Sequence, residues 1–287
     1  MIFSRARLPK RCVTLAGLVV GLTMTAGAGS AHAGAWTLPK GSGQVIVTNL
    51  YYWAHDQFSK AGNRHGFSDD GEFTKYELNP YIEYGLRDDL TLVLNTFVRR
   101  VAFSNDFSTD VNFGIADPEL ALRYRLSSPD SPTVWAAQVG LKFPVAVPDG
   151  NPPLGNAQTD VEARLLVGRG FSIFGRWAYW DVEVAYRFRD GAPADEIKLD
   201  LTLGVSLTDR WLVIGQFFGT HGLRNGSDIE IPDNPTIDPN YDLYKAQLSV
   251  VYTLTQSWRL QLGYQRDLAG RNTGAGQAAL LGVWYRF

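Results

Sequence analysis

Cysteine is almost absent from this chain of 287 residues, and long apolar runs are absent beyond its N-terminal part. The one cysteine, Cys12, lies in a segment that we expect to be removed from the mature protein. The remaining chain therefore has neither a disulfide framework nor a thiolate metal site. No stretch after residue 28 reaches the roughly 20 apolar residues that a membrane-spanning helix needs, which excludes helical membrane proteins.

The N-terminus has the three parts of a secretory signal peptide. Four basic residues precede an apolar run over residues 13–28, and small residues then lead to Ala31-His32-Ala33. A basic region, a short apolar region and an A-x-A cleavage signature predict a signal peptide at residues 1–33 and a mature chain over 34–287. The alternative is an uncleaved N-terminal anchor.

The mature chain also lacks an excess of positive charge. Removing residues 1–33 leaves 254 residues with 23 basic and 29 acidic side chains, a formal charge of −6. A nucleic-acid partner is therefore not expected. Composition alone fits a soluble or a membrane β-protein, because a barrel hides its apolar residues in alternation.

Alternation with a period of two is the main signal in the sequence. From 196 to 207, the odd positions are apolar and the even positions are polar or small, a pattern that a helix cannot produce. Twelve segments follow this rule, and each is long enough for the ~9–11 residues of a tilted membrane-spanning strand. The segments are 43–54, 74–86, 90–103, 115–126, 133–143, 158–168, 176–189, 196–207, 210–221, 241–253, 258–268 and 276–287.

The connections and the aromatic residues agree with a barrel. Tight turns such as 87–89 and 208–209 alternate with longer connections at 55–73, 104–114, 144–157, 190–195, 222–240 and 269–275. Short periplasmic turns and longer outer loops are the arrangement of outer-membrane barrels. Apolar-parity aromatics gather near both strand ends, as two interfacial girdles would require: Tyr84, Tyr124, Trp135, Trp211, Tyr252, Trp258 and Tyr285 near turns, and Trp53, Tyr76, Phe103, Phe143, Phe188, Tyr244 and Tyr264 near loops.

The chain ends in an amphipathic strand whose last residue is Phe287. A terminal aromatic resembles the assembly signal of bacterial outer-membrane proteins. We therefore expect an all-β, up-and-down transmembrane barrel of about twelve antiparallel strands in the outer membrane. Its expected partners are the assembly machinery, the membrane lipid and lipopolysaccharide.

The polar parity should face the lumen, and it carries eleven acidic and twelve basic residues, so the interior is nearly neutral. Such charges either pair into a closed network or line a thin aqueous path. We expect most of them to pair structurally and a few to set selectivity. The candidate selectivity residues are Arg123, Arg125, Arg164, Arg187, Glu119, Glu162 and Glu183. Proline and glycine in 144–157 predict a structured loop that folds inward.

Catalytic and metal-binding patterns are weak. None of the mature histidines, His55, His65 and His221, has a serine two residues later, and Ser227 follows His221 only at a distance of six residues. We therefore predict no catalytic residue, with a lipid-modifying hydrolase as the minor alternative. The acidic loop Asp228, Glu230, Asp233, Asp238 and Asp242 matches no dedicated calcium loop, so no metal or cofactor is predicted.

Three segments resemble a known outer-membrane family. Residues 34–44 read Gly-Ala-Trp-Thr-Leu-Pro-Lys-Gly-Ser-Gly-Gln, residues 76–86 end in Tyr-Gly-Leu, and residues 117–120 read Asp-Pro-Glu-Leu. The chain resembles the family labelled for the meta-pathway of phenol degradation, and XagA-like surface proteins are similar too. Ala116 departs from the family's Gly-Asp-Pro pattern. The resemblance implies passage of small hydrophobic or aromatic molecules and supplies no catalytic residue.

The sequence thus predicts a passive channel for small solutes. Two alternatives stay open. One is a plugged surface barrel with a structural, adhesive or polysaccharide-related role, and the other is the lipid-modifying hydrolase. The identity of the solute, the state of the lumen and the roles of loops 55–73, 144–157 and 222–240 are not fixed by the sequence.

Overall fold

The computed structural model describes residues 34–146, 150–156, 158–227 and 240–287. The chain divides into two compact units, Met1–Ser30 and Ala31–Phe287, and every described residue belongs to the second. The expected signal peptide and most of the acidic loop after Ser227 lie outside the described residues. The described part contains no helix, and so none that is long and apolar enough to cross a membrane.

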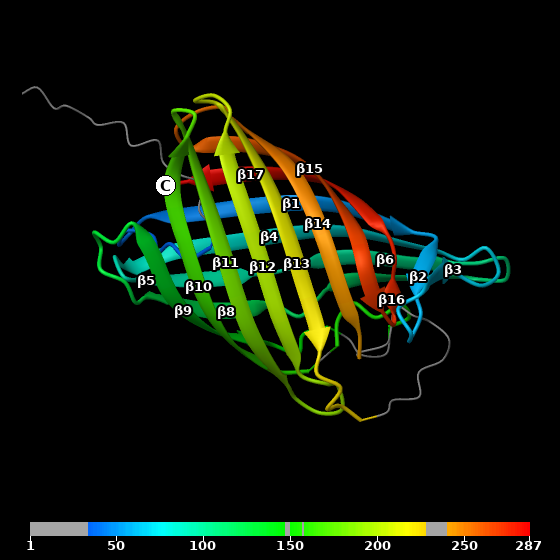
Figure 1. Ribbon diagram of the computed structural model, residues 1–287. Coiled ribbons are helices and arrows are strands. Elements are labelled where there is room, and N and C mark those ends of the chain that lie inside the picture. The colour runs from blue at the N-terminus through cyan, green and yellow to red at the C-terminus, as the bar shows by residue number, and fades with distance from the viewer. Residues whose placement is uncertain (1–33, 147–149, 157, 228–239) are drawn as a thin grey trace, which may run out of the picture. The chain divides into compact units, whose positions relative to one another are not determined.

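Seventeen strands form the described fold (Figure 1). Fourteen belong to one antiparallel sheet: β1 (Gly43–Ala54), β4 (Glu72–Arg87), β5 (Leu90–Asn95), β6 (Val98–Ser104), β7 (Thr109–Ile115), β8 (Glu119–Arg125), β9 (Thr133–Lys142), β10 (Asp160–Ile173), β11 (Arg176–Arg189), β12 (Glu196–Ser206), β13 (Trp211–Gly222), β14 (Asp242–Thr253), β15 (Trp258–Arg271) and β17 (Gln277–Arg286). The other three, β2 (Asp56–Phe58), β3 (Arg64–Gly66) and β16 (Thr273–Gly274), make a small separate sheet.

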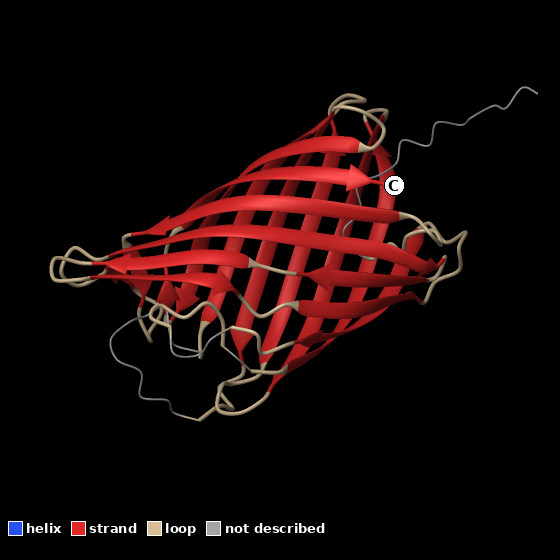
Figure 2. Ribbon diagram, turned by 180° about the vertical axis from the view of Figure 1, so that it is seen from behind, coloured by secondary structure: helices blue, strands red, loops and turns tan. Residues whose placement is uncertain are grey.

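The large sheet closes on itself as a barrel, because β1 pairs with β17 on one side and with β4 on the other. β5 and β6 follow one another along a single stave, and so do β7 and β8, which gives twelve staves. Short breaks at 96–97 and 116–118 separate the halves and are visible as tan segments in Figure 2. The predicted fold, an antiparallel barrel of twelve strands, is confirmed.

The alternation of the sequence corresponds to an outer and an inner face. On the outer face, Leu165 and Leu248 have 60% and 59% of their surface exposed, whereas their inward neighbours Leu166 and Ser249 are buried. Large apolar side chains are exposed in this way around the whole barrel, far beyond the patches that soluble monomers tolerate. Lipid must cover this face, and the protein is an outer-membrane β-barrel.

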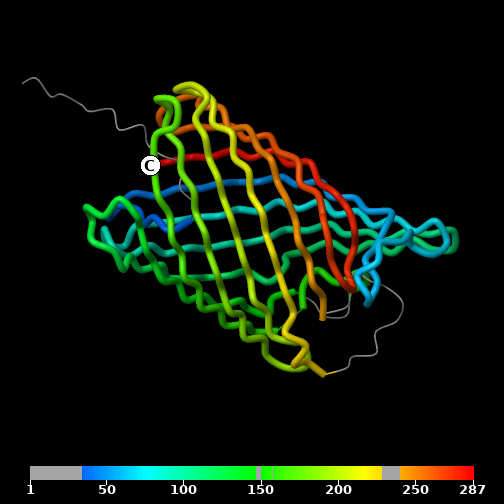
Figure 3. The backbone as a smooth tube through the Cα atoms, in the orientation of Figure 1, coloured from blue at the N-terminus to red at the C-terminus, as the bar shows by residue number. Residues whose placement is uncertain are grey.

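Connections of different length lie at the two ends of the barrel (Figure 3). The turn end carries 88–89, 126–132, 174–175, 207–210 and 254–257. The described connections of the loop end are 55–71, 105–108, 143–146, 150–156, 158–159, 190–195, 223–227, 240–241 and 272–276. The predicted long loop at 104–114 is wrong, since β7 begins at Thr109 and only four residues join it to β6. The alternation of Val111, Phe113 and Ile115 in the sequence already indicated a strand there.

The barrel seam explains the position of the terminal phenylalanine. The backbone groups of Phe287 and Gly43 exchange hydrogen bonds of 3.1 and 2.9 Å, so the last residue pairs with the first residue of β1. The ring of Phe287 stacks on Tyr285 at a centroid distance of 5.8 Å and covers Gly43, where a Cβ atom would overlap it. The terminal aromatic therefore joins the closing pair of strands. Its recognition by the assembly machinery stays a prediction.

Aromatic pairs mark both ends of the outer face. At the turn end, Trp211 packs on Tyr252 and Trp258 on Tyr285, each at 4.6 Å between ring centroids. Phe103 does not belong to the loop-end girdle as expected. It has the parity of inward-facing Val101 and packs edge-on against Phe67, 5.4 Å away. The break at 96–97 leaves the parity unchanged, because Thr91 and Val93 on β5 are buried as Val101 is, so strict alternation from β5 already places Phe103 on the inner face.

Candidate functional site

The inward-facing side chains divide the lumen wall into two parts. Charged side chains line β8 to β12, whereas β13, β14, β15 and β17 carry glutamine, serine and apolar side chains such as Leu212, Ile214 and Trp284, with few charges among them. The predicted neutral mixture of charges is thus present, but it is concentrated on one side of the barrel. All seven candidate selectivity residues lie on β8, β10 and β11 within this charged side.

Arg164 on β10 is the centre of one set of ion pairs. Its guanidinium lies 2.9 Å from Glu162 on the same strand and 2.5 Å from Asp200 on β12, and it also contacts Glu183 on β11. Because β11 lies between β10 and β12, the side chain crosses its neighbour along the inner surface. One cation thus serves three carboxylates with little exposed surface.

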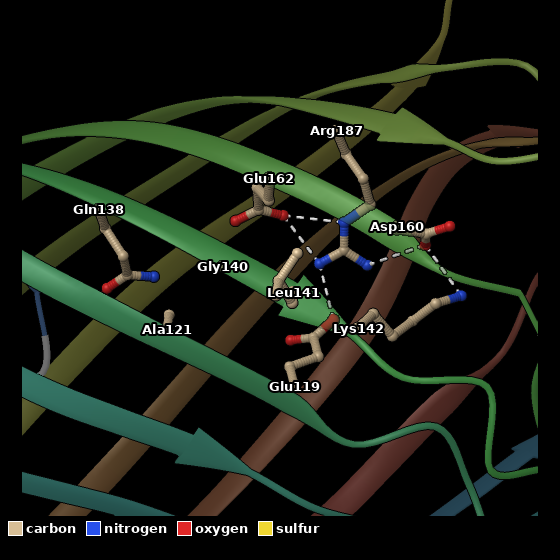
Figure 4. Close-up of a pocket in the computed structure, with 9 residues that line it drawn as sticks. All are labelled: Glu119, Ala121, Gln138, Gly140, Leu141, Lys142, Asp160, Glu162 and Arg187. Atoms are coloured by element: carbon tan, nitrogen blue, oxygen red, sulfur yellow. Dashed lines mark hydrogen bonds and ion pairs between the residues drawn. The ribbon is translucent and has the colours of Figure 1, made fainter.

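Arg187 on β11 forms the second set, which Figure 4 shows in close-up. Its Nη2 atom lies 2.7 Å from Glu119 on β8 and 2.8 Å from Glu162, and its Nη1 atom lies 3.9 Å from Asp160. Glu162 is shared with Arg164, so the two sets are continuous. Towards the loop end, Lys142 extends them with an ion pair of 2.8 Å to Asp160.

We call these residues the ionic network: Glu119, Lys142, Asp160, Glu162, Arg164, Glu183, Arg187 and Asp200. A cavity of about 30 Å³ lies beside it, between β8 and β11, where Ala121 and Gly140 leave room next to Glu119 and Arg187 (Figure 4). The network brings together five of the seven candidate residues. Lys142 and Asp200 were on the polar parity as well, but their depth relative to Arg164 and Arg187 could not be read without the register.

Arg123 and Arg125 lie apart from the ionic network. Arg123 is 3% exposed, and its Nη1 atom pairs with Glu83 on β4 at 2.8 Å. It also donates to Gln138 at 3.1 Å. Within the residues that the structure describes, no carboxylate lies within 4.0 Å of Arg125, near the turn end of β8. A role in selectivity stays a prediction for all seven residues.

The segment before β1, residues 34–42, enters the lumen from the turn end; we call it the N-terminal segment. Ala35 is completely buried against Val134, Ala136 and Leu166 of β9 and β10. Trp36 packs edge-on against Tyr179 on β11 at 5.8 Å. The segment therefore crosses the lumen from β1 to the opposite wall.

Backbone hydrogen bonds fix the N-terminal segment in this position. The carbonyl oxygen of Trp36 accepts a hydrogen bond of 3.2 Å from Arg123, and the amide of Leu38 donates to Thr91 at 2.8 Å. The amide of Lys40 donates to the Asp88 carboxylate at 2.9 Å. Arg123 thus binds both the N-terminal segment and Glu83. The sequence did not lead us to predict this plug. Its signal was that Trp36 and Leu38 are apolar side chains outside any predicted strand, so other residues must bury them.

Gly85 on β4 gives a direct test of this placement. A Cβ atom there would overlap the carbonyl oxygen of Pro39 and lie 2.6 Å from that of Leu38. Gly85→Ala should therefore displace the N-terminal segment and lower the free energy of unfolding by about 1–3 kcal/mol, the usual cost of overpacking. Urea unfolding in lipid bilayers, with protease cleavage of residues 34–42, measures both effects.

Gly215 on β13 is the matched control, because nothing lies within 4 Å of a Cβ atom built there. Gly215→Ala should change the free energy of unfolding by about 0.5 kcal/mol or less. Equal effects of the two substitutions would contradict the described path of the N-terminal segment along β4.

The opposite wall carries a chain of neutral hydrogen bonds. Gln247 donates to Gln216 at 3.0 Å and to Ser249 at 3.2 Å, Gln261 donates to Ser249 at 3.0 Å, and Trp284 donates to Gln261 at 2.9 Å. These residues come from β13, β14, β15 and β17. The sequence signal for these hydrogen bonds was glutamine on the polar parity. A search of that parity for charged residues alone overlooks it.

At the loop end, the connection between β9 and β10 packs on the inner surface. Leu154 is buried against Val101 and Ala116, and its carbonyl oxygen accepts a hydrogen bond of 2.8 Å from Arg99. Asn112 on β7 donates to the carbonyl oxygen of Pro152 at 3.0 Å. The expected inward folding of this loop is confirmed for its described residues. It completes the wall beside β7, which pairs only with β6 in the described part of the sheet.

Asp195 ties two outer loops together. Its carboxylate accepts hydrogen bonds from Tyr186 Oη at 2.6 Å, the Arg189 amide at 2.9 Å and the Asn225 side chain at 2.9 Å. Burial acts to raise the pKa of this carboxyl, but these hydrogen bonds outweigh it and hold the pKa below its ordinary value.

A lowered pKa predicts how this tie responds to pH. The stabilisation should be complete above the ordinary aspartate pKa of about 3.9 and should be lost as the pH falls through the lower value of the folded protein. An NMR titration of the Asp195 carboxyl carbon should give a midpoint below about 3.9. Asp195→Asn should remove the accompanying shift of the Arg189 amide. A midpoint above 3.9 would contradict the hydrogen-bond account.

The histidines considered for catalysis lie at the loop end. His221 Nδ1 lies 3.1 Å from Tyr244 Oη and 3.6 Å from Asp242, and His65 Nδ1 contacts the carbonyl oxygen of Gly66. Neither has a serine hydroxyl among the contacts given for the described residues. The absence of catalysis stays a prediction.

Comparison with known proteins assigns this barrel to a protein family. The model of the family described as "Putative MetA-pathway of phenol degradation" matches residues 26–287. The chain belongs to this family. The family resemblance predicted from residues 34–44, 76–86 and 117–120 is thereby confirmed. No curated protein is similar enough to the chain to be matched.

Solved structures similar to this chain include a bacterial outer-membrane channel. The COG4313 outer membrane channel from Pseudomonas putida F1 is 15% identical, with a TM-score of 0.66 over 90% of this chain and 100% of that one. The translocator domain of the autotransporter NalP from Neisseria meningitidis has 12% identity and a TM-score of 0.49 over 86% and 89% of the two chains. For the KdgM porin the values are 8%, 0.48, 84% and 99%. The first of these structures supports the fold described above.

Proposed function

We propose that this protein is a passive channel for small solutes across the outer membrane. The observation that carries the proposal is the charged wall of β8 to β12, where a cavity of about 30 Å³ lies beside the ionic network. A barrel that served only as an anchor could fill its interior with apolar side chains. A polar wall with an internal space is what a water-filled path requires.

The pairing of charges bears on the kind of solute. Each cation of the ionic network has a carboxylate within 2.9 Å, although five carboxylates share three cations. The eleven acidic and twelve basic residues of the whole polar parity nevertheless leave the lumen nearly neutral. The opposite wall carries neutral hydrogen-bonding side chains among buried apolar ones, with few charges. We infer weak ion selectivity and passage of neutral or zwitterionic solutes. Trp177 stacks on Tyr179 at 5.1 Å beside Trp36, and these rings would suit the aromatic solutes that the family description suggests.

A second candidate function follows from the two obstructions of the lumen. The N-terminal segment fills the turn end, and residues 150–156 narrow the loop end. If neither yields, the barrel is closed, and the surface role in adhesion or polysaccharide assembly becomes the better account. In both cases the partners that we propose are lipid, lipopolysaccharide and the assembly machinery, without catalytic residues, metal or cofactor.

Solute flux separates the two functions. Liposomes with the refolded protein should swell in isotonic solutions of a zwitterionic amino acid or a small sugar, and swell more slowly in a tetraalkylammonium salt. Benzoate is a suitable aromatic probe, because the anion crosses pure lipid slowly. Swelling no faster than that of protein-free liposomes, with a correctly folded barrel, would overturn the channel. It would leave the plugged surface barrel.

A further inference from the structure

Asp181 on β11 stands out among the buried acids of the lumen. It is 2% exposed, and its Oδ2 atom accepts a hydrogen bond of 2.8 Å from the backbone amide of Ala35. Within the described residues, no lysine, arginine or histidine nitrogen lies within 4.0 Å of it. A carboxylate in such surroundings costs free energy unless a positive charge or several donors satisfy it.

The other buried acids of the lumen have partners that Asp181 lacks. Glu83 pairs with Arg123 at 2.8 Å, and Asp160 pairs with Lys142 at 2.8 Å. Asp267 has no cation within 4.0 Å in the described part either, but it accepts hydrogen bonds from Tyr52 Oη at 2.7 Å and the Gly276 amide at 3.0 Å. Asp181 has the Ala35 amide and the acidic side chain of Glu183 beside it, where its counterparts have a cation or two donors. The space beside its carboxylate is therefore suited to a cation.

Gly34 occupies that space. A Cβ atom built on Gly34 would lie 2.6 Å from Oδ2 and 2.9 Å from Oδ1 of Asp181, so the Cα atom of Gly34 lies directly against the carboxylate. The φ angle of Gly34 is +130°, a conformation that side chains other than glycine rarely adopt. The backbone nitrogen of Gly34 is one bond from this Cα atom. Any charge on that nitrogen would be next to Asp181.

The predicted cleavage site supplies this charge. A signal peptidase that hydrolyses the bond between Ala33 and Gly34 adds one water molecule, leaving a carboxylate on Ala33 and an amine on Gly34 that takes up a proton at neutral pH. We propose that Asp181 binds the α-ammonium group of Gly34 in the mature protein. The ion pair exists only after processing, because the amide nitrogen of the precursor carries no charge.

This ion pair would give the N-terminal segment a second fixed end. β1 holds one end at Gly43, and Asp181 holds the other on the far wall, with Trp36 and Ala35 packed between them. Removal of the signal peptide and closure of the turn end thereby become one event. The lumen acquires its plug when the chain reaches its final compartment.

Reactivity of the α-amine tests the proposal in the full mature protein. Intact mass should first show that the exported protein begins at Gly34. In the folded barrel, an amine reagent selective for N-termini should modify Gly34 slowly, and Asp181→Asn should speed the reaction about tenfold or more, as loss of a charged hydrogen bond implies. Asp209→Asn is the matched control on an exposed turn, and it should leave the rate unchanged.

Acetylation of Gly34 before refolding keeps the test independent of how the Asp181 variant folds. The acetylated wild-type protein has no α-ammonium, so protease should cleave residues 35–42 as fast as in Asp181→Asn. Acetylation of the Asp181→Asn protein should add nothing further. A different first residue, equal labelling of wild type and Asp181→Asn, or unchanged protection after acetylation would each overturn the proposal.

Discussion

Arg164→Gln should be the most destabilising single change inside the barrel, by about 3–5 kcal/mol in the free energy of unfolding. The substitution leaves Glu183 and Asp200 without the only cation within 4.0 Å of them in the described residues, while Glu162 keeps Arg187 at 2.8 Å. Two adjacent buried carboxylates repel each other as well as lacking a partner. Urea unfolding in phospholipid bilayers, followed by tryptophan fluorescence, measures the loss.

Arg125→Gln is the matched control, because it removes the same charge from the same face where no carboxylate in the described part lies within 4.0 Å. It should cost about 1 kcal/mol or less. Adding Glu183→Gln and Asp200→Asn to Arg164→Gln should restore most of the stability. If Arg125→Gln and Arg164→Gln cost the same, the ion pairs around Arg164 contribute no net stability.

Leu201→Arg on β12 should give the second large effect. Leu201 is 37% exposed on the outer face and lies opposite Val182 and Phe217, which are on the same apolar parity. A cation near the middle of the lipid-facing surface of a barrel costs about 2–4 kcal/mol. The same unfolding measurement should show this loss, together with a lower folding yield.

Thr202→Arg is the control for that position. Thr202 is the next residue along the strand, faces the lumen and lies opposite Asp181 and Gln216, so the new cation would meet polar groups. It should cost distinctly less than Leu201→Arg. The reverse order would mean that the inner and outer faces have been exchanged.

The fold could be predicted from the sequence because the membrane acts on every strand. Each strand from β9 to β15, and β17, has one face in lipid, so its apolar parity is continuous and its position follows within a few residues. β7 is an exception, because the sequence did not predict it as a separate strand. Its alternation is separated from that of β8 by Ala116, Asp117 and Pro118, and the proline interrupts the ladder. A break of this kind reads as the end of a strand.

The site could be predicted only in part, because the depth of each charge depends on register. Alternation shows that Arg123 and Arg164 face the lumen, but the pairing of β8 with β5 and β4, and of β10 with β11 and β12, decides which acids they meet. Arg123 meets Glu83 beyond β5, and Arg164 meets Asp200 beyond β11. The N-terminal segment has no periodicity at all, so its path through the lumen required the structure.

Single-channel conductance tests the central claim, that a polar path crosses this barrel and the N-terminal segment restricts it. The mature protein and a variant lacking residues 34–40 would be compared in planar bilayers, with the ionic network unchanged. We expect small discrete steps from the mature protein and clearly larger steps from the truncated one. Silence from both folded proteins would contradict the account, because the wall itself would then close the lumen.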